Sequence, residues 1–231
     1  MPLPKISQPL FQLNIPSTGK AIRYRPFTVR EEKLLLMAQE SGDKNDITNT
    51  YKQLINNCCI DPIDVDKLAS FDIEYFFICL RAKSVSNISK VLVRDEDGEQ
   101  YEVEINLDKI KVESNEEVSN NVKLTDTIGI ILKYPTFNVL ASINNVEDKM
   151  DTTLSILRGC IDQVYEGEEV HDVSNYTAQE VNDFILSLNK NQIEEIQKFF
   201  ENMPKIVYDA KYVNKNKELK EVRIEGLENF F

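Results

Sequence analysis

The apolar residues of this chain are grouped in short stretches that alternate between the period of a strand and the period of a helix. Residues 10–27 and 88–113 each contain two strand-like runs around a turn, at residues 16–19 in the first and at Asp97-Gly98 in the second. Three helical stripes lie between them. Because strands joined by tight turns pair antiparallel, the pattern predicts an α+β fold in which β-hairpins flank small helical bundles, with mainly antiparallel pairing.

Capping residues indicate where the first helices begin and end. Thr28 and Glu31 form a capping box, in which the hydroxyl takes a free backbone N–H and the glutamate reaches back to Thr28. Residues 41–43 end that helix, and Ser70 is the predicted cap of the third one. The second helix carries one apolar stripe at helical spacing, formed by Ile47, Tyr51, Leu54, Ile55, Cys58 and Cys59.

The second half of the chain follows a similar plan. Residues 128–134 predict a strand that Pro135 ends, and Thr177 and Asn191 are the predicted caps of two helices. Residues 206–224 predict a final hairpin. A further helix is predicted over residues 150–165 from the spacing of Leu154, Leu157, Ile161 and Val164.

The best candidate for a linker is the polar, turn-rich segment 113–121. It divides the chain into residues 1–113, with a hairpin, three helices and a second hairpin, and residues 122–231, with a strand, helices and a C-terminal hairpin. The alternative is an ordinary surface loop within one continuous domain.

Charge and hydropathy exclude several classes of partner. The 39 acidic and 27 basic side chains give a formal net charge of −12. Phosphate backbones repel such a chain, so we expect no nucleic-acid binding. No apolar run approaches the roughly 18 residues that a membrane span needs, so we expect no such span.

The residue types that usually carry catalysis or bind metals are few. The chain has one histidine, His171, and four cysteines without a CxxC pair. Asp61, Asp64 and Asp66 lack the glycine and the terminal glutamate of a calcium loop. Cys160 and His171 would need an orienting group and a pocket to act as a nucleophilic pair. We therefore expect no catalytic residue, no metal, no cofactor and no small-molecule substrate.

A locally basic strip in the first hairpin and the helix after it is a candidate partner-binding surface. In a chain of net charge −12, such a strip suits an acidic partner, whose charges would mainly set the association rate and orientation. The alternative is pairing within the chain, with Glu31, Glu32 and other acids. The strip consists of Arg23, Tyr24, Arg25, Arg30 and Lys33.

The C-terminus is a second candidate. Leu227, Phe230 and Phe231 are spaced i, i+3 and i+4, which puts them on one side of a short helical turn. A turn of this length is not stable alone, and exposed phenylalanines would leave apolar area in water. The tail therefore packs either on the core of this chain or on a partner, and both alternatives stay open.

A series of short motifs runs along the chain. The motifs are Pro-Ser-Thr-Gly-Lys at 16–20, Tyr-Arg-Pro-Phe at 24–27, Val-Arg-Glu-Glu-Lys-Leu-Leu-Leu-Met-Ala at 29–38, Ile-Asn-Asn-Cys at 55–58, Phe-Asp-Ile-Glu-Tyr at 71–75, Arg-Ala-Lys-Ser-Val at 81–85, Leu-Lys-Tyr-Pro at 132–135, Gly-Leu at 226–227 and the terminal Phe-Phe. In their order and spacing, these motifs resemble one known family, the T4-type baseplate hub subunits of contractile-tailed phages. The resemblance covers nearly the whole chain and is strongest in residues 1–110.

The resemblance implies a non-enzymatic role in building the central hub of the tail baseplate, through contacts with other hub and tail proteins. It implies that the protein is found in the host cytoplasm during assembly, and in the virion baseplate if it is retained. Some relatives carry cysteines in the hairpin at 88–104. This chain has none there, so a zinc role is not expected.

Other functions remain as alternatives to a hub subunit or hub assembly factor. One is a transient tail-assembly chaperone that is absent from the virion. A second, from another class, is a small metal- or nucleotide-dependent enzyme that uses scattered carboxylates. A third is a host-directed regulator that mimics DNA by its charge, although the acids are interspersed with lysine and arginine.

Overall fold

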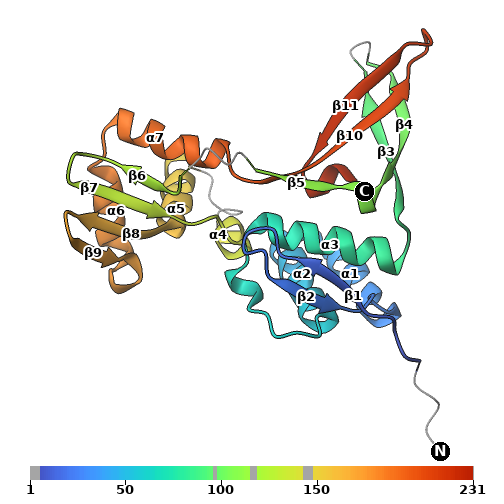
Figure 1. Ribbon diagram of the computed structural model, residues 1–231, viewed down its shortest axis with the longest axis horizontal. Coiled ribbons are helices and arrows are strands. Elements are labelled where there is room, and N and C mark those ends of the chain that lie inside the picture. The colour runs from blue at the N-terminus through green and yellow to red at the C-terminus, as the bar shows by residue number, and fades with distance from the viewer. Residues whose placement is uncertain (1–5, 96–97, 115–118, 143–147, 231) are drawn as a thin grey trace, which may run out of the picture. The chain divides into compact units, whose positions relative to one another are not determined.

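The computed structural model describes residues 6–95, 98–114, 119–142 and 148–230 (Figure 1). Within these ranges the strand pairings are antiparallel, which confirms the predicted α+β class. The α-helices are α1 (Val29–Ser41), α2 (Lys44–Cys58), α3 (Ser70–Ser84), α4 (Phe137–Ser142), α5 (Lys149–Cys160), α6 (Ala178–Leu186) and α7 (Lys190–Glu201). Short 3-10 turns are η1 (Val65–Lys67), η2 (Leu107–Lys109), η3 (Val173–Asn175) and η4 (Leu227–Phe230).

Within the described residues, the strands form four small sheets, ordered β1-β2, β3-β4, β11-β10-β5 and β6-β7-β8-β9. Asp97, one of the two residues of the second predicted turn, lies outside the described residues. The strands are β1 (Phe11–Asn14), β2 (Ala21–Tyr24), β3 (Ile88–Arg94), β4 (Gln100–Asn106), β5 (Lys111–Glu113), β6 (Asn121–Lys123), β7 (Ile128–Leu132), β8 (Ile161–Glu166), β9 (Glu169–Asp172), β10 (Lys205–Val213) and β11 (Leu219–Glu225).

The chain forms two compact units. Unit 1 comprises Met1–Glu113 together with Lys205–Phe231, and unit 2 comprises Ser114–Pro204. This grouping differs from the expected division into residues 1–113 and 122–231, because the C-terminal hairpin joins the first half. Pairing of β5 with β10, in which Ile206 lies opposite Val112, connects the two parts of unit 1.

Helix α3 forms the centre of unit 1. Phe71, Ile73, Phe76, Ile78 and Leu80 are all buried, and at helical spacing they point to different sides of the helix. A helix that is apolar all round must be covered on several faces. Here α2, η2, β10 and η4 contact it.

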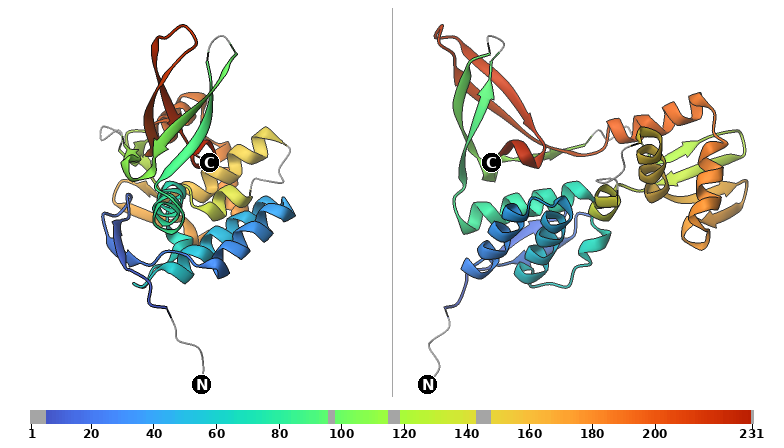
Figure 2. Two further views of the ribbon diagram at one scale, coloured as in Figure 1. Left: turned by 90° about the vertical axis from the view of Figure 1, so that its right-hand side faces the viewer. Right: turned by 180° about the vertical axis from the view of Figure 1, so that it is seen from behind.

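Two hairpins of unit 1 lie side by side, β3–β4 and β10–β11 (Figures 1 and 2). The rings of Tyr101 and Tyr212 are 5.2 Å apart. The backbone N–H of Asn106 donates to the hydroxyl of Tyr208 at 3.3 Å. Contacts between β4 and β10 therefore bring together segments that are about a hundred positions apart in sequence.

The C-terminal turn η4 packs into unit 1, in contact with α3, β3 and β11. Phe230 is 0 % exposed and Leu227 is also buried. The hydroxyl of Ser89 on β3 donates to the backbone oxygen of Phe230 at 2.8 Å. Of the two alternatives for the tail, the structure shows packing on the chain's own core for Leu227 and Phe230. Phe231 lies outside the described residues.

In unit 2, α5, α6 and α7 pack on the face of the four-stranded sheet that carries Ile130 and Leu132. The predicted helix over 150–165 is wrong in its second part, because α5 ends at Cys160 and β8 begins at Ile161. Val164 lies in β8, where it pairs with both neighbouring strands. Pairing on two sides outweighs the helical spacing of a single apolar stripe.

Because Phe230 is buried, we expect its side chain to contribute to the stability of the fold. Replacing it by alanine removes a buried ring from between α3 and the hairpins, so the free energy of unfolding should fall by about 3–5 kcal/mol. Urea titration followed by circular dichroism measures this. The control is Leu92→Ala on β3, whose side chain is 69 % exposed, with an expected change within about 0.5 kcal/mol. Equally small changes in both variants would contradict a structural role for the tail.

Candidate protein-binding surface

Helix α1 begins and ends where the sequence predicts. The backbone N–H and the hydroxyl of Thr28 donate to one oxygen of Glu31, at 2.8 and 2.6 Å. Glu31 therefore satisfies a backbone donor that the helix itself leaves free. At the other end Gly42 adopts a left-handed conformation, with φ of 68°, which stops the helix.

One side of α1 exposes large apolar side chains to solvent. Val29 is 79 % exposed, Leu36 54 % and Met37 56 %. Their spacing of i, i+7 and i+8 puts them on the same side of the helix, away from the buried Glu31 and Ala38. We call Val29, Lys33, Leu36, Met37 and Glu40 the α1 face. Clustered apolar side chains on a surface are typical of a protein-binding site.

The sequence interpretation included Lys33 in a candidate binding surface but missed the apolar side chains beside it, although a signal was present. Residues 34–38 are five consecutive apolar residues, Leu-Leu-Leu-Met-Ala. A helix with one buried face cannot bury so many in a row, because consecutive residues are about 100° apart around its axis. Some of them had to face solvent, and these are Leu36 and Met37.

Three of the five predicted strip residues make contacts with other residues of this chain. Arg23 pairs with Asp61 at 2.7 Å, and this hydrogen bond lowers the pKa of Asp61 to about 2. Arg25 contacts Glu31 at 3.0 Å and the backbone oxygen of Asn57 at 2.9 Å. Tyr24 is buried, with its ring edge-to-face against Phe76 at a centroid distance of 5.4 Å.

The other two strip residues remain on the surface. Arg30 and Lys33 are exposed, and the structure gives neither an ion pair among the described residues. The strip is therefore divided: its hairpin part stabilises unit 1, and its helix part borders the apolar side chains of α1. A partner-binding role for these residues, and for Leu227 and Phe230 in the tail, stays a prediction. For Leu227 and Phe230, a partner-binding role would require η4 to detach from the core of unit 1.

Glu31 is the charged group that connects the strip to the helix. It is 3 % exposed. Burial alone would raise its pKa, but hydrogen bonds from Arg25 and Thr28 outweigh this and lower the pKa to about 2. One carboxylate thus caps α1 and binds the end of β2, so the orientation of α1 on the hairpin depends on it.

The thiols are not placed for nucleophilic chemistry. Burial raises the pKa of Cys58 and of Cys79 to about 11 and that of Cys160 to about 12, so these groups are protonated at neutral pH. His171 contacts the hydroxyl of Tyr176, with its Nδ1 2.8 Å from that oxygen. Among the described residues, no three His, Cys, Asp or Glu side chains are grouped to hold a metal ion.

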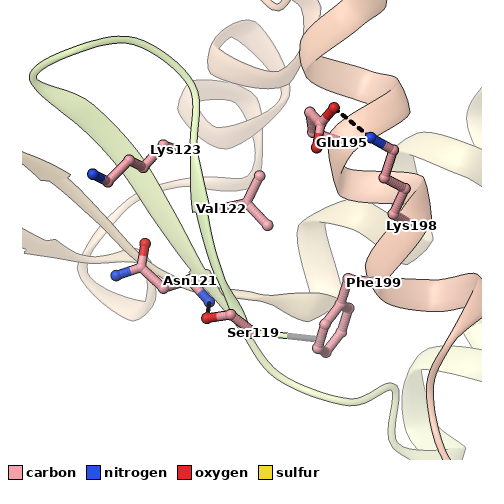
Figure 3. A pocket seen from close by; sticks show the side chains of 7 residues that line it. All are labelled: Ser119, Asn121, Val122, Lys123, Glu195, Lys198 and Phe199. Carbon is pink, nitrogen blue, oxygen red and sulfur yellow. Dashed lines mark hydrogen bonds and ion pairs between the residues drawn. The ribbon is translucent and has the colours of Figure 1, made fainter. Parts of the chain in front are cut away.

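A groove of about 610 Å³ lies between β6 and α7 in unit 2 (Figure 3). The one carboxylate among its lining residues, Glu195, pairs with Lys198 at 2.6 Å. These side chains can bind polar groups, but they include no thiol or imidazole for catalysis. The lining residues are Ser119, Asn121, Val122, Lys123, Glu195, Lys198 and Phe199.

The described part of the chain is thus a mixed α+β protein that exposes apolar side chains along one side of α1. The model of the T4 bacteriophage base plate protein family matches residues 8–231, and the chain belongs to this family. No curated protein and no solved structure matches it.

Family membership implies a structural role in a phage baseplate and contacts with other phage tail proteins. It confirms the sequence resemblance at the level of the baseplate. Among the described helices, none combines the length and the apolar character needed to cross a lipid bilayer.

The low pKa of Glu31 gives a prediction for acid stability. Because the folded-state pKa of about 2 lies below the unfolded value of about 4.3, the stabilisation is present above the unfolded value. It is lost as the pH falls through the folded one. At about 1.4 kcal/mol per pKa unit, it is on the order of 2–3 kcal/mol.

Wild-type stability should therefore fall more steeply than that of Glu31→Gln between about pH 5 and pH 2. Urea titrations at a series of pH values measure both slopes. Glu32→Gln, which removes an exposed carboxylate from the same turn, is the matched control. Parallel pH curves for the wild type and Glu31→Gln would contradict the role assigned to Glu31.

Proposed function

We propose that this protein is a subunit of the phage baseplate hub, or a factor that assembles the hub, and that it acts through protein–protein contacts. The observation that carries the proposal is the match to the base plate protein family over residues 8–231. The hub role rests on the motifs that resemble hub subunits, above all those in residues 16–38.

The surface of unit 1 supports a binding role. Val29, Leu36 and Met37 are large apolar side chains that an isolated protein leaves in water. Covering them by another chain would be favourable, because apolar area contributes about 25 cal/mol per Å² when it is removed from water. The exposed α1 side chains are thus better explained by assembly than by catalysis.

The charge distribution disfavours the DNA-mimic alternative. Many acidic side chains are neutralised by basic neighbours, as in the pairs Lys90–Glu102 and Lys83–Asp108. A mimic of a phosphate backbone would instead present unpaired acids in rows. Within the described residues, the acids on the hairpins form a mixed network with Lys and Arg.

The proposal predicts a complex that can be isolated. Co-expression of the tagged protein with the other hub proteins of its phage should yield a co-purifying complex with a defined stoichiometry. A protein that associates with no tail protein, at low or at physiological salt, would contradict the proposal.

Mass spectrometry of purified particles then distinguishes a structural hub subunit from a transient assembly factor. Stoichiometric presence in the particle would identify a structural hub subunit, made in the host cytoplasm and retained in the virion. Absence from the particle, with tail assembly failing when the gene is deleted, would identify a transient assembly chaperone.

A further inference from the structure

The charges on the α1 face run against the usual preference of a helix. Lys33 lies in its N-terminal half and Glu40 in its last turn, and both are exposed. The helix dipole favours acids near the N-terminus and bases near the C-terminus, so neither residue is placed to stabilise its own helix. Among the described residues, the structure gives neither Lys33 nor Glu40 an ion pair, so both charges are available to a partner.

The same face is apolar in the middle. Leu36 and Met37 lie between the two charges, and Lys33 precedes their midpoint by the same number of positions as Glu40 follows it. At about 1.5 Å per residue, each charge is therefore about 5 Å from the midpoint. Arg30 and Glu32 lie at the two margins of the face, one of each sign.

We propose that the α1 face binds the α1 face of a second copy of this chain, as an antiparallel helix pair. A two-fold axis through the midpoint brings Leu36 and Met37 of the two copies together. It also places each Lys33 opposite the Glu40 of the other copy. The interface is self-complementary in polarity and charge, as a two-fold interface requires.

The inference rests on the proposed function only in that the protein acts through protein contacts. Antiparallel packing also lets each helix dipole face the opposite end of its neighbour. A single helix pair buries less than the roughly 1,200 Å² typical of stable complexes. We therefore expect a weak dimer that forms at high protein concentration and is strengthened where an assembly holds two copies close together.

Charge exchange tests the pairing directly. Lys33→Glu and Glu40→Lys each place like charges opposite one another in a homodimer, so each variant should remain monomeric at concentrations where the wild type dimerises. An equimolar mixture of the two variants should dimerise again, because one copy then carries an acid at both positions and the other copy carries a base at both. The double variant should also dimerise, because the exchange restores opposite charges. Sedimentation equilibrium over a range of protein concentrations measures the wild type, the two single variants, their mixture and the double variant.

A remote substitution of the same kind controls for net charge. Lys190→Glu changes an 88 % exposed lysine in unit 2 and should leave the dimer unchanged. Unfolding midpoints of all variants in urea should match the wild type, which shows that α1 stays folded.

Three results would overturn the inference. The first is a wild type that is monomeric at every concentration. The second is a dimer that neither single variant weakens, and the third is a mixture in which dimerisation is not restored. If the wild type is monomeric and Leu36→Glu reduces capture by hub proteins, another tail protein occupies the face. The proposed function would then stand without the self-pairing.

Discussion

Burial of α3 is the constraint on which unit 1 depends. Its apolar side chains point in all directions, so the helix is stable only when other elements cover it, and α2, η2, β10 and η4 do so. Its first turn also holds the first hairpin, because Asp72 accepts hydrogen bonds from the backbone and the hydroxyl of Ser17, at 2.8 and 2.5 Å. Burial raises the pKa of Asp72, and these bonds oppose the rise. The β1–β2 hairpin is thereby held against the helix that the C-terminus covers.

From this anchored hairpin a second polar contact sets the direction of α1. Arg25, which directly follows β2, binds the carboxylate of Glu31, which also caps the helix at Thr28. With that end of α1 held by Glu31, the side that carries Ala38 turns inward and the side that carries Leu36 turns outward. The candidate binding surface is therefore a consequence of how one buried carboxylate is paired, and its apolar and charged residues are presented on a supported helix.

Local signals predicted much of the fold. The caps at Thr28 and Thr177 follow from bonds between side chains and the nearby backbone. Gly42 ends α1 because a residue without a Cβ adopts the left-handed conformation readily, and the final hairpin follows from two strand-like runs around a turn. Where the prediction was wrong, a longer-range interaction or a different local bond decided the outcome. The cap of α7 is Asn189, whose side chain accepts from the backbone N–H of Gln192, and not Asn191. The cap of α3 is Ala69 and not Ser70, because the carboxylate of Asp72 accepts from the backbone N–H of Ala69. Ile161 and Val164 fit a helical stripe, but both pair with β7, and Val164 also pairs with β9, so both lie in β8.

The sequence alone therefore determined the class of the fold, the starts and ends of several helices, and the resemblance to baseplate proteins, because these depend on neighbouring residues and on motif order. Only the tertiary structure decided which of the basic residues form ion pairs within the chain. Only it decided that Leu227 and Phe230 belong to the core of unit 1. It alone also decided which side of α1 remains exposed. The reason is physical: burial and pairing depend on elements that are distant in the chain, such as β3 for Phe230 and Asp61 for Arg23, and no local pattern records which of them will meet.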